Sequence, residues 1–223
     1  MMWRAGLGVL VAAGIGLGQL RPAQVVILLG PPGSGKSVQA GLLSKTYKVP
    51  AISMASLFER ESKKRTPLAK ALASAIASGE LVSDDAANEV MQTRLLRPDA
   101  GKGFILDGYP RTPEQAKALD AFLVEHGFPK PTVVILEATD DVLRERLKKR
   151  HAADDDAANV ERRIREYRDH ETFTEGRYGT ENTVRVDGSG SVTVVARAIA
   201  TGIDGLRQKK GLKVRQLEDR PPQ

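Results

Sequence analysis

The stretch that decides the fold is Gly30-Pro31-Pro32-Gly33-Ser34-Gly35-Lys36-Ser37. It follows the apolar run 25–29, which predicts a buried strand, and residues 38–43 continue it as the start of a helix. A strand, a glycine-rich loop of the form G-x-x-x-x-G-K-[ST] and a helix make up a phosphate-binding P-loop in its required context. The alternative is a glycine-rich turn that matches by chance, and the flanking strand and helix weigh against it. The stretch predicts that the chain binds a nucleoside triphosphate.

The residue types in this loop suit anion binding. Gly33 and Gly35 let the backbone bend, so that successive N–H groups converge on one anion. The start of the helix adds unpaired donors and a favourable dipole. Lys36 supplies a point charge for the outer phosphates, and the Ser37 hydroxyl can ligate Mg²⁺. A magnesium-bound triphosphate is therefore the expected ligand.

Composition narrows the class of protein. The 223 residues are enough for one sizeable core, and the absence of cysteine excludes a disulfide framework and a thiolate metal site. The formal net charge of +6 raises the question of nucleic acid. However, the lysines and arginines are spread through segments that also carry acids, and only 4% of the residues are aromatic, too few for base stacking. We expect no nucleic-acid partner.

Strands and helices alternate along the middle of the chain. The expected strands are 104–107 and 132–137, and the expected helices are 56–61, 67–78, 84–95 and 140–150. Asp84-Asp85 offers an N-cap for the third of these helices, which stops before Pro98. This alternation predicts an α/β fold with a parallel sheet covered by helices on both faces.

A second candidate site is the segment 103–112, where an apolar strand ends in a carboxylate. Asp107, at the carboxyl end of a strand beside the P-loop strand, is where a Mg²⁺–water shell would be held. Arg111, fixed by Pro110, can face a phosphate with two parallel hydrogen bonds. Taken singly, Asp107 is as well explained by a cap and Arg111 by a surface ion pair. Together with the P-loop, they predict a phosphate-handling site.

The chain resembles the adenylate kinase (nucleoside monophosphate kinase) family from Val25 to about Gly202. The likeness is carried by GPPGSGKSVQA (30–40), SGELVSDD (78–85), GFILDGYPRTPEQAKAL (103–119) and VVILEATDDVLRERLKKR (133–150). The resemblance implies a P-loop kinase fold and an ATP- and Mg²⁺-dependent phosphotransferase. It also implies a CORE (24–203) that contains a helical NMP-binding insertion (53–82) and a short lid (150–160), followed by a basic, proline-containing tail (204–223).

The same resemblance implies a role for each site residue. The ATP-binding set is Gly33, Ser34, Gly35, Lys36, Ser37, Val38, Arg146, Arg150 and Gly190. The monophosphate-binding set is Leu81, Val82, Gly108, Arg111, Gln115 and Arg163. The catalytic set is Lys36, Arg111, Arg146, Arg150 and Arg163, and the metal set is Ser37 and Asp107. In these sets Gln115 would hydrogen-bond the acceptor base, and Arg163 would bridge both phosphate groups.

Several departures from the family pattern bear on these roles. Met54 stands where the family has an acceptor-contacting threonine, and Glu59 where it has an arginine for the acceptor phosphate. The P-loop reads Lys-Ser-Val instead of Lys-Gly-Thr, and Ser37 restores the general P-loop hydroxyl. In the short lid, Ala152 aligns with a family arginine. No Cys/His cluster is present, which excludes a zinc-bearing lid, and His151 is expected to be a surface residue.

The leading hypothesis is a monomeric nucleoside monophosphate kinase that transfers the γ-phosphoryl group of MgATP to AMP or a related monophosphate. The departures at Met54, Glu59 and Ala152 motivate an alternative, an ATP-binding homologue that has lost catalysis and acts in regulation or interaction. A third hypothesis keeps the enzyme and changes the acceptor to a different small molecule. The base-facing role implied for Gln115 weighs against it.

The N-terminal residues pose a separate question. Met1-Met2-Trp3-Arg4 precedes a stretch, 5–20, that is apolar apart from Gln19 and carries no charge. This pattern suits a secretory signal or a short membrane anchor, although a spanning helix usually needs ~20 apolar residues. A misassigned start or a disordered extension is the alternative, because the catalytic fold needs nothing before Gln24. We expect a cytoplasmic location, where ATP is available, with export or membrane association through residues 5–20 as the alternative.

Overall fold

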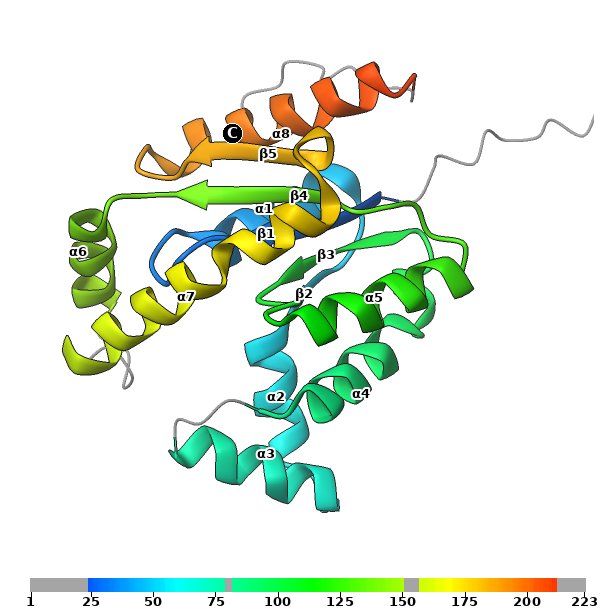
Figure 1. Ribbon diagram of the computed structural model, residues 1–223, viewed down its shortest axis with the longest axis vertical. Helices are drawn as coiled ribbons and strands as arrows, with labels where there is room; N and C mark the ends of the chain where they lie inside the picture. Colours follow the sequence, from blue (N-terminus) through cyan, green and yellow to red (C-terminus); the bar gives the residue numbers. More distant parts are fainter. Residues whose placement is uncertain (1–23, 79–81, 151–156, 212–223) are drawn as a thin grey trace, which may run out of the picture.

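A five-stranded parallel sheet forms the centre of the computed structural model, which describes residues 24–78, 82–150 and 157–211 (Figure 1). The strands are β1 (Gln24–Leu29), β2 (Ala51–Ser53), β3 (Gly103–Asp107), β4 (Thr132–Glu137) and β5 (Thr183–Asp187). Their order across the sheet is β2-β3-β1-β4-β5, and each neighbouring pair is parallel. The predicted α/β fold with a parallel sheet is confirmed.

Helices lie on both faces of this sheet (Figure 1). The described helices are α1 (Lys36–Tyr47), α2 (Met54–Ser62), α3 (Pro67–Ser78), α4 (Asp84–Leu95), α5 (Pro113–Glu125), α6 (Asp140–Arg150), α7 (Ala157–Tyr178) and α8 (Val192–Lys209). The described residues also form two short 3₁₀ helices, Pro98–Ala100 between α4 and β3 and Thr180–Asn182 between α7 and β5. α1 and α8 pack together against one face, and α5 and α7 cover the other.

The alternation of side chains along the strands divides the core into two layers. Val25 and Ile27 of β1 pack with α4 and α5, whereas Val26 and Leu28 point to the opposite face and pack with α1 and α8. All four side chains are buried. Because both faces of β1 are covered, this strand reads in the sequence as an uninterrupted apolar run.

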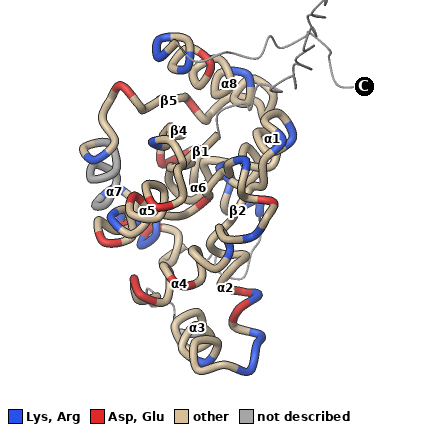
Figure 2. Tube along the Cα trace, turned by 90° about the vertical axis from the view of Figure 1, so that its right-hand side faces the viewer, with Lys and Arg blue, Asp and Glu red and all other residues tan. Residues whose placement is uncertain are grey.

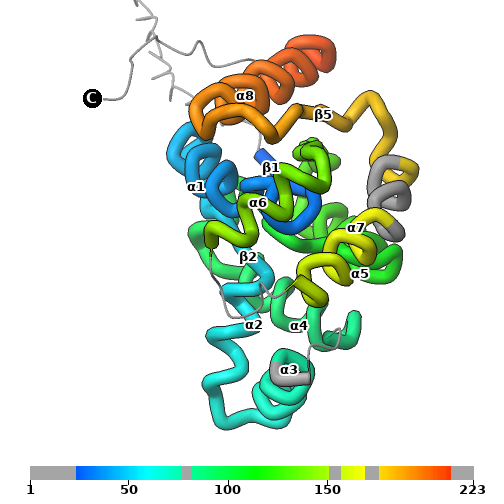
Figure 3. Tube along the Cα trace, turned by 90° about the vertical axis from the view of Figure 1, so that its left-hand side faces the viewer, coloured from blue at the N-terminus to red at the C-terminus, as the bar shows by residue number. Residues whose placement is uncertain are grey.

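The carboxyl ends of the strands meet at one edge of the sheet, which faces the viewer in Figure 3. At this edge β1 leads into residues 30–35, and β3 leads into residues 108–112. The two strands are direct neighbours, with Leu28 aligned to Asp107. The loops that follow them therefore lie side by side, where ligands bind in open α/β sheets.

Helices α2 and α3 extend away from the sheet at the lower end of Figure 1. α2 follows β2 directly, α3 packs on α2, and α4 returns the chain to the sheet. Positive and negative residues interleave around the turn between α2 and α3 (Figure 2). Here Lys63 pairs with Glu59 and Lys64 with Glu61, each at 2.7 Å.

Several element boundaries differ from the sequence analysis. The N-cap of α4 is Ser83 rather than Asp84 or Asp85, because the Ser83 hydroxyl accepts a hydrogen bond from the backbone N–H of Ala86. α8 continues to Lys209 and so includes the first residues of the segment 204–223 that the sequence analysis assigned to the tail. The strands β2 and β5 and the helices α5 and α7 were not predicted from the sequence. The boundaries of the CORE, the NMP-binding insertion and the lid stay predictions.

Candidate active site

The loop after β1 has a backbone conformation that suits phosphate binding. Gly33 and Gly35 adopt φ angles of 83° and 92°, in the left-handed region that favours glycine. A Cβ atom on Gly33 would lie 3.0 Å from the carbonyl oxygen of Leu143, so the loop packs directly against α6. α1 then begins at Lys36 without a side chain capping its first turn. The first N–H groups of α1 are therefore available to an anion.

The Lys36 ammonium group lies inside this loop. Its Nζ donates hydrogen bonds to the carbonyl oxygens of Gly30 and Pro31, at 2.5 Å and 2.9 Å. The loss of hydration lowers the pKa of Lys36 from 10.5 to about 8. Among the described residues, the direct hydrogen-bond partners of this cation are two carbonyl dipoles, and a phosphate would be a stronger partner for it.

Arginines from separate segments lie close enough to this ammonium group to act on it electrostatically. Arg111 follows β3, Arg150 ends α6, and Arg163 belongs to α7. Each of the three lowers the pKa of Lys36, whereas Asp107 raises it. Like charges so close together are unfavourable unless an anion lies between them. The structure therefore brings together four of the five residues that the sequence predicted to be catalytic, at a place suited to phosphate.

The predicted metal residues also meet at this place. Ser37 Oγ donates a hydrogen bond to Asp107 Oδ2 at 2.6 Å. Within the described parts of the chain, no three His, Cys, Asp or Glu side chains gather closely enough to hold a metal ion by themselves. Mg²⁺ is commonly bound by one or two protein oxygens together with water and substrate phosphates. A hydroxyl and a carboxylate beside the phosphate loop fit this mode of binding.

Arg146, in the middle of α6, lies beside Gly190, with its Nη2 3.5 Å from the carbonyl oxygen of Gly190. Arg146 donates hydrogen bonds to the carbonyl oxygens of Gly188 at 2.8 Å and Ser189 at 3.1 Å. Gly190 follows in the same loop, at one end of a groove of about 710 Å³ between β5 and α8. These contacts tie α6 to the loop after β5.

Several of the residues predicted to bind the monophosphate form a compact hydrogen-bonded group. Gln115, in the first turn of α5, is buried, and its Oε1 accepts a hydrogen bond from the backbone N–H of Arg111 at 2.7 Å. Its Nε2 donates to Asp84 Oδ1 at 2.8 Å. Arg111 Nε donates to the carbonyl oxygen of Gly108 at 3.1 Å. Three of the predicted monophosphate-binding residues are thus held in one loop and the helix that follows it.

Comparison with known proteins gives the family. The family model described as adenylate kinase matches residues 28–181. The chain is 40% identical over 183 residues to an adenylate kinase of Xylella fastidiosa (strain M12), which covers 80% of this chain and 98% of that protein. It is 42% identical over 175 residues to an adenylate kinase of Mycobacterium tuberculosis (strain ATCC 25618 / H37Rv), with 78% and 96% covered. The chain belongs to the adenylate kinase family. It is a phosphotransferase of the kind that acts on nucleoside monophosphates.

This adenylate kinase family member departs from the family pattern on the acceptor side. Met54 is buried at the start of α2, in the same apolar cluster that Val82 packs against. Glu59 is exposed, and its carboxylate accepts a hydrogen bond from Lys63 at 2.7 Å, which lowers the pKa of Glu59. The departures therefore remove a hydroxyl and add a carboxylate that is only partly neutralised. Leu81, His151 and Ala152 lie outside the described residues.

Sequence reasoning missed one polar residue of the site, Asp84. Two adjacent aspartates at the start of a helix suit the helix dipole, so the pattern indicates a cap and nothing more. In the fold, Asp84 Oδ1 accepts from Thr112 Oγ1 and from Gln115 Nε2, across separations of 28 and 31 residues. No local spacing in the sequence carries that information.

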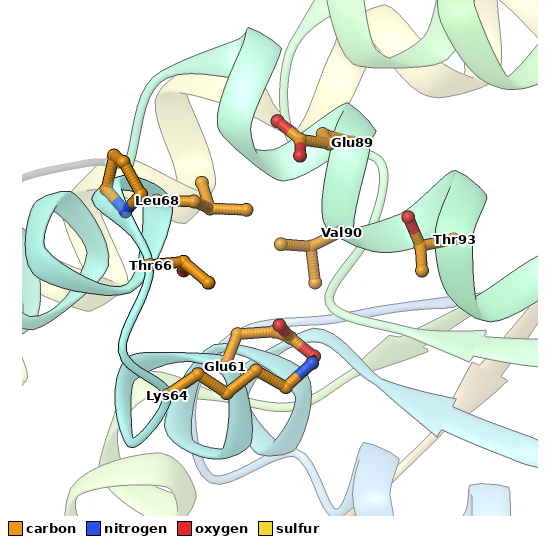
Figure 4. Close-up of a pocket in the computed structure, with 8 residues that line it drawn as sticks. Glu61, Lys64, Thr66, Leu68, Glu89, Val90 and Thr93 are labelled. Carbon is orange, nitrogen blue, oxygen red and sulfur yellow. The ribbon is translucent and has the colours of Figure 1, made fainter.

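A separate hollow of about 430 Å³ lies between α2, α3 and α4 (Figure 4). The ion pair Glu61–Lys64 forms one wall, Thr66 and Leu68 lie beside it, and Val90 lies across from them. None of the residues predicted to bind nucleotide lines this hollow. It is therefore distinct from the candidate active site of this adenylate kinase family member.

No helix within 24–78, 82–150 or 157–211 is long and apolar enough to cross a bilayer. Residues 5–20, the predicted signal or anchor, lie outside these ranges.

Proposed function

We propose that this enzyme transfers the γ-phosphoryl group of MgATP to AMP or a related nucleoside monophosphate. The observation that carries the proposal is the convergence of Arg111, Arg150 and Arg163 on the Lys36 ammonium group at the carboxyl edge of the sheet. The transfer requires the outer phosphate of a donor to approach the phosphate of an acceptor. Fixed cations from several segments offset the repulsion between these groups.

The donor half supplies position and charge. The backbone N–H groups of residues 33–38 would hold the donor phosphates, and Lys36 would leave its two carbonyl partners to meet them. Ser37 and Asp107 would hold Mg²⁺, which when bound neutralises charge on the phosphates. Arg146 and Gly190 would lie at the nucleoside end of ATP.

The transfer itself needs little covalent chemistry from the protein. Aligned reactants and cations on the equatorial oxygens lower the barrier. Arg111 would hold the acceptor phosphate, Arg150 the donor phosphates, and Arg163 would contact both. The proximity of all three to Lys36 supports this division of roles.

The acceptor half supports a second candidate function. Glu59 carries a carboxylate where the family pattern has an arginine, and Met54 offers no hydroxyl. These departures favour an ATP-binding member of the family that has lost transfer and acts in regulation or interaction. The retained Arg111, Gln115 and Arg163 favour the enzyme, so we rank transfer first.

A coupled assay with MgATP and each of AMP, CMP, UMP and GMP tests the proposal, with Lys36→Met as the background. We expect transfer to at least one monophosphate, and its loss in Lys36→Met. Calorimetric binding of ATP without transfer to any of the four, even at high enzyme concentration, would favour the second candidate. The absence of Mg²⁺-dependent binding of any nucleoside triphosphate would reject both.

The proposal includes a monomer in the cytoplasm, where ATP and monophosphates are available, and no nucleic-acid partner. Export or anchoring through residues 5–20 is the alternative location. Fractionation of cells that express the full chain, with an antibody against the C-terminal tail, distinguishes the two.

A further inference from the structure

Asp84 joins α4 to the part of the acceptor site that carries Arg111. Its Oδ1 accepts hydrogen bonds from Thr112 Oγ1 and Gln115 Nε2, both at 2.8 Å. The same Gln115 side chain accepts the backbone N–H of Arg111 through Oε1, at 2.7 Å. Gln115 is buried and Asp84 and Thr112 are half-buried, so the contacts among these three side chains are partly shielded from water, which strengthens them. One carboxylate oxygen thus contacts two residues of the acceptor side.

These contacts fix which way the Gln115 amide points. A glutamine side chain has an oxygen that only accepts and an NH₂ group that only donates. If the amide turned over, its oxygen would face the Asp84 carboxylate, and its NH₂ group would face the Arg111 N–H. Both contacts would change from attractive to repulsive. One orientation is therefore stable, and it leaves one N–H and one oxygen lone pair of Gln115 for a ligand.

A fixed amide can distinguish two classes of base. Adenine and cytosine carry an exocyclic amine beside a ring nitrogen that accepts, whereas guanine and uracil carry a carbonyl beside a ring N–H. The order of donor and acceptor is therefore reversed between the two classes. An amide held in one orientation can hydrogen-bond the bases of one class and repels those of the other class. An amide that is free to turn can hydrogen-bond both classes.

We propose that Asp84 is a positioning residue that sets the base preference of the acceptor site by holding the Gln115 amide in one orientation. The inference rests on the proposed function, in which Gln115 meets the acceptor base. Asp84 itself does not touch the substrate in this account. Its effect is on the ratio of kcat/KM values between amino and keto bases, which a residue that only stabilises the fold would not change.

The test measures kcat/KM for AMP, CMP, GMP and UMP in the wild type, Asp84→Ala and Asp84→Asn. The wild type is expected to prefer one class of base. Both variants are expected to reduce that preference about tenfold, because a bidentate base contact is worth roughly this factor or more. Alanine removes the carboxylate that holds the Gln115 NH₂ group and leaves the Arg111 N–H as the remaining restraint, and the NH₂ group of asparagine can face the oxygen of a turned Gln115. The KM for ATP is expected to stay within about twofold.

Two matched controls separate positioning from structure. Asp85→Ala removes the neighbouring carboxylate from the same first turn of α4, with an equal loss of helix N-terminal charge. Asn88→Ala, one turn further along α4, removes the 2.7 Å hydrogen bond from the Tyr109 hydroxyl and leaves the Gln115 amide untouched. Both controls are expected to keep the wild-type base preference.

The outcomes distinguish this inference from the proposed function. If the wild type transfers phosphate without a preference between the two classes, or if Asp84→Ala keeps the preference of Asp85→Ala, the inference about Asp84 is overturned and the proposed function stands. If the wild type neither transfers phosphate to any of the four monophosphates nor binds one in calorimetry, the proposed function fails and the inference fails with it.

Discussion

At the scale of single residues, the lowered pKa of Lys36 has a measurable consequence. Burial lowers this pKa to about 8 in the free protein, and bound phosphates would raise it by favouring the charged form. A pKa that rises on binding means that the complex takes up protons at pH values above 8. We expect ATP binding at pH 8.5 to take up most of one proton and to weaken as the pH rises further.

Calorimetry in two buffers of different ionisation enthalpy measures this uptake. Lys36→Met has no titrating ammonium group and is expected to take up none. An equal enthalpy in both buffers for the wild type would contradict the assignment of Lys36 to the phosphates.

Glu59 gives the second prediction at this scale. Its carboxylate lies on α2 and, within the part of the chain that the structure describes, pairs with the exposed Lys63 alone. If it faces the acceptor phosphate, Glu59→Arg should lower the KM for the preferred monophosphate about tenfold, since it replaces repulsion by a charge-assisted contact. Glu59→Gln removes the charge alone and should give part of that gain. Steady-state kinetics check both, and an unchanged KM in the two variants would separate Glu59 from the acceptor phosphate.

At the scale of elements, α6 and α7 position Arg150 and Arg163 through a small apolar cluster. Leu143, Leu147, Val160 and Ile164 are buried there, and Leu147 also packs against the backbone of Gly33. Leu147→Ala is expected to lower the free energy of unfolding by about 2–5 kcal/mol, because it leaves a cavity. It should also raise the KM for ATP, because the P-loop loses a supporting side chain.

The ion pair between the same two helices provides the control for this prediction. Arg144 Nε donates to Glu161 Oε1 at 2.6 Å, but both side chains are nearly half exposed. Glu161→Gln is expected to change stability far less than Leu147→Ala, because exposed ion pairs contribute little. Urea unfolding of both variants measures the difference. A larger loss in Glu161→Gln would mean that charge, not apolar packing, holds α6 to α7.

The elements that the sequence predicted are those whose pattern is local. β1, β3 and β4 are buried on both faces, so each reads as an apolar run. β2 has only three residues, and β5 lies at the edge of the sheet with Arg185 and Asp187 exposed, so neither gives such a run. α7 is rich in charged residues and has a low mean hydropathy, which hides its narrow apolar stripe.

At the scale of the whole molecule, the candidate site also divides into features with a local sequence pattern and features that depend on tertiary packing. The P-loop and Asp107 could be predicted because the loop directly follows an apolar strand and Asp107 ends another one. The resemblance to a family supplied the arginines of α6 and α7. The contacts of Asp84 could not be predicted, because they depend on how α4 packs against α5. Local rules thus predict the P-loop and Asp107, whereas the contacts between Asp84 and Gln115 arise from tertiary packing.

The whole molecule also gives the last prediction, which concerns where the folded unit begins. β1 starts at Gln24, whose backbone N–H donates to Lys102 and whose side chain accepts a hydrogen bond from Arg207 of α8. Removal of residues 1–22, with a start methionine in their place, should leave kcat within about twofold and shift Tm by no more than about 2 °C.

Removal through Val26, which is fully buried, should unfold the chain because it takes away half of the central strand. Differential scanning calorimetry and the coupled assay measure both. A large loss of stability in the first truncation would mean that the N-terminal residues pack on the folded unit, whereas a stable second truncation would contradict the central place of β1.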